Sequence, residues 1–339
     1  MKVLCCVKPG VLEYQERVTP TPISGQSILR IQRIGICGTD LHAFEGTQPY
    51  FEYPRILGHE LAAEIVDANG APGFENGDAV TIIPYFNCGY CIACRSGKPN
   101  CCVTIQVCGV HMDGGMSAYL SVPHYALISS RGLSYDQLAL AEPLAIGAHA
   151  IARAGVKEND FVLIVGAGPI GLAVMEFAKI AGARLIVMDN NPSRLSFCKK
   201  LLNPDFCLGN DIADPIAALH DQTHGDMPSI VIDATGNLQA IDQGFQYMAH
   251  GGKYVLVGLQ KKEIHFSHPE FHKREATLMS SRNATRADFE FVLASISSGK
   301  IDPLPFITHR TGFKDTASDF PGWLDPAQGV VKAMVRLDS

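Results

Sequence analysis

A glycine-rich turn, GAGPIG, follows the apolar and β-branched run Phe161–Val165. A helical pattern begins at this turn and ends at Gly182, and a second apolar run leads to Asp189, 18 residues after the last glycine of the turn. In this context the glycines permit a tight turn, a close approach of backbone to a pyrophosphate, and close packing of helix on strand. The start of the helix offers free N–H groups to phosphates. The pattern therefore predicts a dinucleotide site, with an ordinary βα turn as the alternative.

Asp189 indicates which dinucleotide such a site would bind. A carboxylate at the end of the second strand can accept hydrogen bonds from both ribose hydroxyls of NAD. The same negative charge would repel a 2′-phosphate on that ribose. We therefore expect NAD as the cofactor.

Four cysteines follow the spacing C-x2-C-x2-C-x7-C in a segment rich in Gly, Pro, Lys and Arg. They are Cys88, Cys91, Cys94 and Cys102. Thiolates this close can complete a tetrahedral zinc shell, and a closed shell leaves no position for substrate. A ferredoxin-type cluster requires its fourth cysteine after three residues. Free thiols or a disulfide are further alternatives, and spacing barely separates Cys102 from its neighbour Cys101. We expect a structural zinc in this lobe, about residues 84–104.

A second set of metal-ligand types is dispersed along the chain. Cys37 is followed by the pair His59-Glu60 and, much later, by Glu142. A lone cysteine is most often a small buried side chain, and a lone His–Glu pair is usually a surface feature. Together, one thiolate, one imidazole and one or two carboxylates would leave zinc an open position for a substrate oxygen. Spacing alone does not show that these residues converge.

The segments that must position these residues are of two kinds. Residues 1–138 contain short apolar runs separated by Gly, Pro and Asn, which predict a β-rich domain. From Ala139 strands alternate with helices, which predicts a doubly wound parallel sheet in residues 139–276. The alternation fades in residues 277–339, where short strands and loops are expected to complete the edge of the nucleotide domain and the β-rich domain. We therefore expect an α/β protein with the nucleotide domain inserted into the β-rich one. The expected parallel strands are Asp160–Val165, Arg184–Met188, Ser229–Asp233 and Lys253–Val257.

The composition narrows the class of protein. The chain has 339 residues, of which 47% are hydrophobic and 18% charged, as in an ordinary globular protein. Its net charge is −6 and no Lys/Arg cluster is present, so the sequence does not predict a basic surface for nucleic acid or an anionic membrane. The N-terminal apolar run is too short for a signal sequence, so we expect a cytoplasmic protein. The 11 cysteines then indicate metal ligands and free thiols.

Five motifs in this order resemble the zinc-containing medium-chain dehydrogenases: GICGTDLH, LGHE, the four-cysteine lobe, AEPLA and VGAGPIG. The resemblance covers essentially the whole chain and is greatest for the sorbitol and L-threonine dehydrogenase branch. It implies a GroES-like catalytic domain, an NAD-binding Rossmann domain and an active site between them. It also implies two Zn²⁺ per subunit, one structural and one catalytic. The implied ligands of the catalytic zinc are Cys37, His59 and Glu60, with Glu142 as an alternate or relay ligand.

The resemblance assigns further roles to individual residues. Thr39 and His42 match a relay in which a hydroxyl and an imidazole pass the substrate proton to solvent. The implied cofactor contacts are Gly166, Gly168, Ile170, Gly171, Asp189, Arg194, Val257, Gly258, Leu259, Ser281 and Arg282. For Val257, Gly258 and Leu259 an ordinary buried strand end remains the alternative. For Ser281 and Arg282 the alternative is a plain loop.

The segments VCGVHMDGG and PEFHKREATLMSSRNAT are similar to a bacterial sugar-acid subgroup of L-galactonate 5-dehydrogenase type. The carboxylate of a sugar acid requires a cation, and Arg282 is the first candidate because a guanidinium can bind it bidentately. Tyr50 is expected to line the pocket, with core packing as the alternative. We therefore predict NAD-dependent oxidation of a secondary hydroxyl of a sugar acid. A polyol or L-threonine is the alternative substrate.

Two alternatives belong to other classes of protein. One is an NAD-binding sensor without catalysis, because a fold does not determine a function; the complete set of metal and relay residues argues against it. The other is a zinc-ribbon module for nucleic acid, which the acidic net charge argues against. The expected partners are a small-molecule substrate and further copies of the chain in a homodimer or homotetramer.

Overall fold

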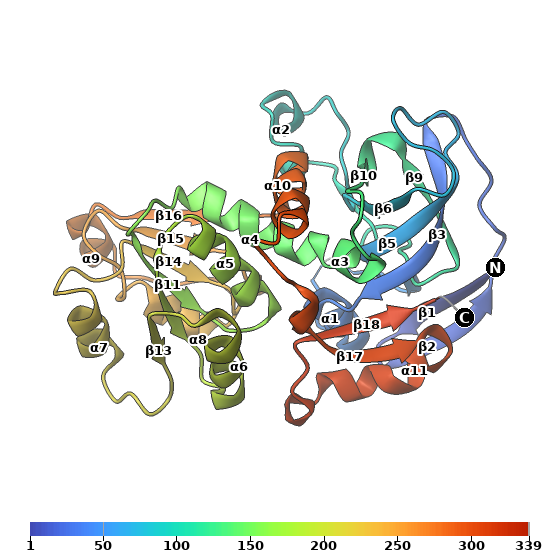
Figure 1. Cartoon of the computed structure of the whole chain (residues 1–339). Helices are drawn as coiled ribbons and strands as arrows, with labels where there is room; N and C mark the ends of the chain where they lie inside the picture. The colour runs from blue at the N-terminus through green and yellow to red at the C-terminus, as the bar shows by residue number, and fades with distance from the viewer. Residues whose placement is uncertain (50, 338–339) are drawn as a thin grey trace. The chain divides into compact units, whose positions relative to one another are not determined.

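The computed structural model describes residues 1–49 and 51–337, and the chain divides into two compact units (Figure 1). Unit 1 consists of Met1–Glu142 together with the segment from Ala284 onward, and unit 2 consists of Pro143–Asn283. A continuous segment is thus inserted into a unit built from both ends of the chain. Within the described residues, no helix is long and apolar enough to cross a membrane.

The main sheet of unit 1 joins strands from the beginning and the end of the chain. Its described part has seven strands in the order β10-β6-β5-β3-β18-β17, and β9 also pairs with β3. Strand β18 runs antiparallel to β3, with Met334 opposite Gly35 (Figure 1). The bounds are β3 Gln26–Gly35, β5 Glu60–Asp67, β6 Ala79–Ile82, β9 Tyr119–Pro123, β10 Leu127–Ile128, β17 Ile307–Gly312 and β18 Lys332–Arg336.

Two smaller sheets and short helices complete unit 1. The sheet β2-β1-β4 consists of Lys2–Lys8 (β1), Val11–Glu16 (β2) and Arg55–Ile56 (β4). Strands β7 (Tyr85–Phe86) and β8 (Gln106–Val107) pair with each other, so they close the base of the segment that carries the four cysteines. The helices are α1 Gly38–Glu45, α2 Ile92–Arg95, α3 Tyr135–Ala139, α10 Arg286–Ser297 and α11 Thr316–Asp319, and α4 (Ala141–Ala154) leads into unit 2.

Apolar side chains attach the C-terminal segment of unit 1 to its N-terminal part. Phe320 is fully buried and its ring lies 5.2 Å from that of Phe44 and 5.3 Å from that of Trp323, measured between centroids. Buried aromatic side chains of this size each contribute about 1.5–3 kcal/mol through the hydrophobic effect. The same core includes Leu29 and Ile31 of β3, so the last strands are held next to the first ones.

Unit 2 contains one parallel sheet with the order β13-β12-β11-β14-β15-β16 in its described residues. This is the 3-2-1-4-5-6 order of a doubly wound nucleotide-binding fold, so the predicted fold class is confirmed. The strands are β11 Phe161–Val165, β12 Arg184–Met188, β13 Phe206–Leu208, β14 Ile230–Asp233, β15 Lys253–Leu256 and β16 Thr277–Ser280. The helices are α5 Pro169–Ile180, α6 Pro192–Leu202, α7 Pro215–Gln222, α8 Leu238–Gly244 and α9 His268–Lys273.

All four strands that alternation predicted are present and parallel. Two strands were missed. Strand β13 has only three residues, which is too short for a periodic pattern. Strand β16 has half-buried and exposed positions, because it pairs on one side only, with β15, at the edge of the sheet. Edge strands lack the continuous apolar run of central parallel strands.

Candidate active site

The glycine turn connects β11 to α5 in a way that only glycine permits. Gly166 has a φ of +102°, and a Cβ there would lie 2.9 Å from a methyl carbon of Thr235. A Cβ on Gly171 would lie 1.8 Å from the carbonyl oxygen of Gly166, so the first turn of α5 could not pack against the end of β11. Gly168 caps α5 and Ile170 lies half-buried in its first turn. The N–H groups that begin α5 thus face the turn, as a phosphate site requires.

Asp189 follows β12 and holds the same turn. Its Oδ2 accepts a hydrogen bond of 2.7 Å from the Ala167 N–H, and its Oδ1 accepts one of 2.7 Å from the Asn191 N–H. Each carboxylate oxygen has a second lone pair, so both remain able to accept from ribose hydroxyls. Arg194 is exposed on α6, and its guanidinium is the group nearest to the Cβ position of Gly168, at 3.9 Å.

The remaining predicted cofactor residues follow β15 and β16. Val257 and Gly258 continue β15, and a Cβ on Gly258 would lie 2.1 Å from the backbone nitrogen of Gly236. Leu259 is 61% exposed, and the buried Ser281 hydroxyl has no hydrogen-bond partner in the described residues. An exposed apolar side chain and an unsatisfied hydroxyl at the carboxyl edge of a parallel sheet suit a bound nucleotide. Arg282 is exposed beside Ser281.

The four predicted cysteines of the lobe converge. The sulfur atoms of Cys88, Cys91, Cys94 and Cys102 all lie within 4.8 Å of one another. Two of these separations are 3.5 Å (Cys91 to Cys94) and 4.0 Å (Cys88 to Cys94). Ligands of a tetrahedral zinc with bonds of about 2.3 Å lie roughly 3.8 Å apart, so the four sulfurs fit a zinc ion. The exposed Cys101 is not in this cluster, so the sulfur that lies with the other three is that of Cys102.

Backbone N–H groups of the lobe already point at its sulfurs. The Cys88 N–H lies 3.3 Å from Cys102 Sγ, and the Cys91 N–H lies 3.4 Å from Cys88 Sγ. A backbone hydrogen bond at Cys94 lowers the pKa of the Cys91 thiol to about 6. Such donors favour thiolates, which are the form that binds zinc.

The dispersed set also converges, at the start of β5. Ligand atoms of Cys37, His59 and Glu60 lie within 4.8 Å of one another, and we call these three residues the triad. Cys37 is the N-cap of α1, immediately after β3, while Glu60 pairs with Gly35 of β3. A Cβ on Gly35 would lie 2.1 Å from Glu60 Oε2, so glycine makes room for that carboxylate. One sulfur, one imidazole and one carboxylate fit an open zinc site.

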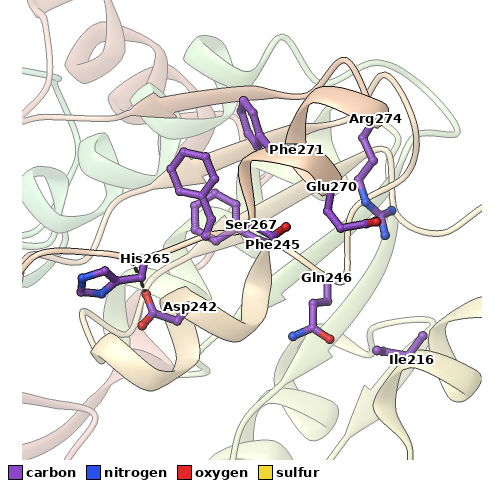
Figure 2. Close-up of a pocket in the computed structure, with 10 residues that line it drawn as sticks. Ile216, Asp242, Phe245, Gln246, His265, Ser267, Glu270, Phe271 and Arg274 are labelled. Carbon is purple, nitrogen blue, oxygen red and sulfur yellow. Dashed lines mark hydrogen bonds between the residues drawn. The ribbon is translucent and has the colours of Figure 1, made fainter.

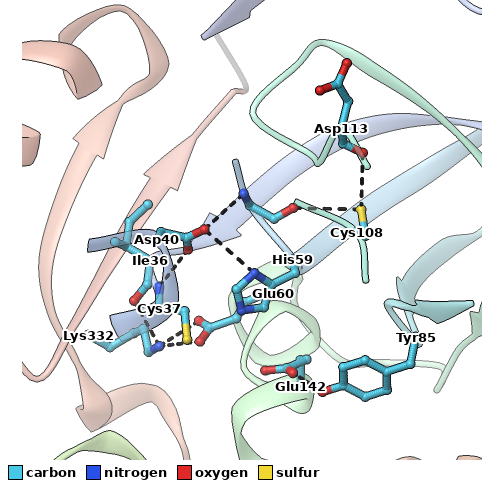
Figure 3. Close-up of polar contacts among 11 residues, drawn as sticks. Ile36, Cys37, Asp40, His59, Glu60, Tyr85, Cys108, Asp113, Glu142 and Lys332 are labelled. Carbon is cyan, nitrogen blue, oxygen red and sulfur yellow. Dashed lines mark hydrogen bonds and ion pairs between the residues drawn. The ribbon is translucent and has the colours of Figure 1, made fainter. Parts of the chain in front are cut away.

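Asp40 is a buried residue of this site that sequence reasoning missed. It is fully buried on α1, where its carboxylate accepts from the Cys37 N–H at 3.0 Å and the Gly58 N–H at 3.2 Å. It also lies 3.7 Å from His59 Nδ1, a buried nitrogen without a hydrogen bond (Figure 3). Burial acts to lower the pKa of His59, but Asp40, Cys37 and Glu142 together outweigh it, and the pKa lies well above its ordinary value. A carboxylate behind a ligating histidine orients the ring.

Lys332 is the second missed residue. Its Nζ donates to Glu60 Oε1 at 2.5 Å, to Glu60 Oε2 at 2.7 Å and to the Ile36 carbonyl at 3.0 Å (Figure 3). It is 2% exposed. Burial acts to lower the pKa of Lys332, but Glu60, Cys37 and Glu142 together outweigh it and the pKa is raised, so Lys332 remains a cation. No sequence signal marked this lysine, because it is separated from Glu60 by 272 residues.

Glu142 lies beside the triad but is not part of it. Its Oε1 accepts a hydrogen bond from the Tyr85 hydroxyl, and both side chains are buried (Figure 3). Burial and, to a lesser degree, the negative Glu60 raise the pKa of Glu142 while His59 opposes the rise, and the net pKa is about 6. Tyr85 had no role in the sequence prediction.

The predicted relay residues occupy α1. Thr39 is half-buried, and His42 is exposed with its Nδ1 3.2 Å from Thr47 Oγ1 and 3.3 Å from Glu45 Oε2. The relay through Thr39 and His42 stays a prediction. Tyr50 lies outside the described residues.

A pocket of about 440 Å³ in unit 2 involves none of these residues. It lies among α7, α8 and α9, and the aromatic rings of Phe245 and Phe271 line one side of it (Figure 2). Glu270 and Arg274 are on its other side (Figure 2). The candidate chemistry is therefore separate from the pocket.

Comparisons with known proteins agree with this geometry. Residues 24–131 match the family model of the alcohol dehydrogenase GroES-like domain, and residues 169–298 match that of the zinc-binding dehydrogenases. L-galactonate-5-dehydrogenase of Escherichia coli (strain K12) is 44% identical over 321 residues, which are 94% of either chain. Sorbitol dehydrogenase of Halalkalibacterium halodurans is 32% identical, covering 91% of this chain and 92% of its own.

A similar solved structure, described as a short chain alcohol dehydrogenase (rspB) from E. coli CFT073 complexed with NADH, is 30% identical to this chain. The two structures align with a TM-score of 0.92 over 99% of each chain.

Proposed function

Since the chain belongs to the zinc-binding dehydrogenase family and is thus an oxidoreductase acting on CH–OH groups, we propose that it oxidises a secondary hydroxyl of a sugar acid with NAD. The observation that carries the proposal is the convergence of Cys37 with the adjacent pair His59 and Glu60 from two separate segments of the chain. An open site of this kind suits a substrate that must place one oxygen on a metal.

Zinc held by the triad would act as a Lewis acid that lowers the pKa of the substrate hydroxyl. Asp40 orients the His59 ring, and Lys332 holds the carboxylate of Glu60. Thr39 and His42 would carry the hydroxyl proton towards solvent, where His42 is exposed. A second zinc in the four-cysteine lobe is part of the proposal and would be structural, because four thiolates leave no open position.

We propose that NAD binds unit 2 along the carboxyl edge of its sheet. Gly166, Gly168, Ile170 and Gly171 would contact the pyrophosphate, and Asp189 would accept from the ribose hydroxyls. Arg194 would lie against the adenine end. The nicotinamide end would contact Val257, Gly258, Leu259, Ser281 and Arg282. The NADH-bound relative supports this cofactor class.

The substrate proposal rests on the 44% identity to L-galactonate-5-dehydrogenase and on the exposed Arg282. A guanidinium can bind a carboxylate bidentately, and Tyr50 is proposed as a further substrate contact. Polyol oxidation is the second candidate, because a sorbitol dehydrogenase is also similar over most of the chain. We also propose a homodimer or homotetramer, from the resemblance alone, and a cytoplasmic location.

The test is NADH formation by zinc-replete protein, measured with L-galactonate, L-gulonate, D-gluconate, sorbitol, xylitol and L-threonine, and with NADP in place of NAD as a separate series. Preference for one aldonic acid with NAD is the expected result. Arg282→Ala should then raise KM for that acid, while Lys273→Ala, which removes another exposed cation of unit 2, should not. Turnover of polyols or L-threonine alone would contradict the sugar-acid assignment.

A further inference from the structure

Besides Asp40, two buried carboxylates lie at the triad, and each is held by a different kind of donor. Glu60 is paired through both oxygens with the cation of Lys332. Glu142 accepts instead from the neutral hydroxyl of Tyr85 (Figure 3). Glu142 is close enough for the charges of His59 and Glu60 to shift its pKa, yet it lies outside the set of converging ligand atoms. The structure therefore separates one carboxylate inside the triad from one beside it.

The Tyr85 hydroxyl is placed by a rigid segment. Tyr85 is 5% exposed, and its ring packs edge-on against Phe289, with centroids 6.4 Å apart. Its strand β7 pairs with β8. The two residues before Tyr85 also form backbone hydrogen bonds: the Ile83 N–H donates to the Ala126 carbonyl at 2.8 Å, and the Pro84 carbonyl accepts from the Cys108 N–H at 2.9 Å. A tyrosine side chain has only two torsions, so this backbone determines where the hydroxyl lies.

The Tyr85 hydroxyl holds a carboxylate that a metal in the triad would attract. A buried carboxylate is costly without a counter-charge, and Glu142 has a neutral donor where Glu60 has a cation. A divalent ion in the triad would therefore attract Glu142 strongly. If Glu142 joined the triad, the metal would have four protein ligands and would resemble a closed structural site.

We propose that Tyr85 is a positioning residue that keeps Glu142 from occupying the open coordination position of the triad metal, so that this position stays available to the substrate oxygen. The inference rests on the proposed zinc site at the triad. It gives Tyr85 a role in preserving access to the metal, without contact to substrate or to the metal itself.

Tyr85→Phe removes only the hydroxyl and tests this role. Once released, Glu142 should compete with substrate for the metal, so KM should rise while kcat at saturating substrate changes much less. Zinc at the triad should be retained more strongly against a graded series of chelator, by about 10- to 100-fold, the usual size of effects from groups that orient metal ligands. The visible spectrum of cobalt-substituted protein, taken as a difference from the parent, should report the added carboxylate.

Two controls separate this effect from the loss of any buried hydroxyl. Tyr254→Phe removes a buried hydroxyl of unit 2 that donates to the Ile241 carbonyl at 3.0 Å, and it should leave zinc retention unchanged. In a Glu142→Gln background, Tyr85→Phe should tighten zinc no further, because the competing carboxylate is already absent.

The outcomes distinguish this inference from the function on which it rests. A parent protein with two zinc ions per chain, whose Tyr85→Phe variant has unchanged or weaker zinc retention and an unchanged KM, overturns the inference and leaves the proposed function standing. A parent that binds a single zinc, in the four-cysteine lobe, overturns both.

Discussion

Asp40 and Lys332 are buried charges that contact two different members of the triad. Asp40 accepts from the backbone on either side of the site, at Cys37 and Gly58, and places its charge behind His59. Lys332 holds both oxygens of Glu60. At the scale of residues, the geometry of the metal ligands therefore depends on charges that do not themselves bind the metal.

Asp40→Asn should lower zinc retention at the triad and kcat/KM by about 10- to 100-fold, because an amide cannot supply the charge that orients His59. Zinc per chain after dialysis against chelator, together with steady-state kinetics, measures both. Asp67→Asn is the matched control, since Asp67 also accepts from a backbone N–H but on the exposed surface of unit 1. Equal zinc retention in the parent and the Asp40 variant would contradict the orienting role.

Asp189→Asn should reduce the preference for NAD over NADP by about tenfold or more, because like charges placed together cost several kcal/mol. The measurement is kcat/KM with each cofactor. The ratio of the two values supplies its own control. Loss of the hydrogen bond from the Ala167 N–H would weaken both cofactors alike, whereas relief of repulsion favours NADP alone. An unchanged ratio would show that Asp189 does not discriminate between a ribose 2′-hydroxyl and a 2′-phosphate.

At the scale of elements, the hairpin of β7 and β8 connects the lobe with the triad. The lobe lies between these strands, and β7 itself carries Tyr85, whose hydroxyl reaches Glu142. The lobe contains little regular structure of its own, only the one-turn helix α2 and a short 3-10 turn at Pro99–Cys101. Its conformation must therefore depend largely on the four cysteines and what they bind.

Cys102→Ser should remove one zinc per chain and destabilise unit 1, whereas Cys101→Ser should change neither. Cys102 is 2% exposed within the sulfur cluster, and Cys101 is exposed outside it. A loss of about 2 kcal/mol would lower Tm by about 4–8 °C in a unit of this size. Zinc analysis and thermal unfolding measure the two effects. The same zinc content in both variants would argue against Cys102 as a ligand.

At the scale of the whole molecule, unit 1 is closed by the two ends of the described chain. Strand β18 pairs with β3 in the same sheet, and this pairing brings Lys332 to Glu60 at the start of β5. Glu60 of the triad therefore gains its buried cation only when the C-terminal segment has folded onto the N-terminal one.

Lys332→Met should destabilise the protein more without zinc than with it. In chelated protein the variant leaves Glu60 buried without its cation, a change that typically costs about 3–5 kcal/mol, whereas bound zinc would offset that charge. Urea unfolding of chelated and zinc-loaded protein measures the difference. The exposed Lys300→Met is the control and should have little effect in either state. Equal losses with and without zinc would contradict a charge-pairing role.

The features that the sequence determined by itself are local or periodic. The glycine turn and the four-cysteine lobe each lie within a short segment, so spacing predicted both features, although the choice of Cys102 over Cys101 also needed the resemblance. Alternation of apolar runs predicted four of the parallel strands. The triad was predicted as a set only through the resemblance, because nothing in the spacing of Cys37, His59 and Glu60 requires them to meet.

The tertiary structure decided which distant side chains meet. The contacts of Asp40 with Gly58, Tyr85 with Glu142 and Lys332 with Glu60 span 18, 57 and 272 residues. Such contacts depend on how strands pair and helices pack, and an isolated Asp, Tyr or Lys leaves no periodic signal in the chain. Strand β16 had no clear signal in the sequence for a related reason, since an edge strand pairs on one side only. The sequence therefore identified the metal-ligand and cofactor residues, and the packing of remote segments determined which buried charges lie beside them.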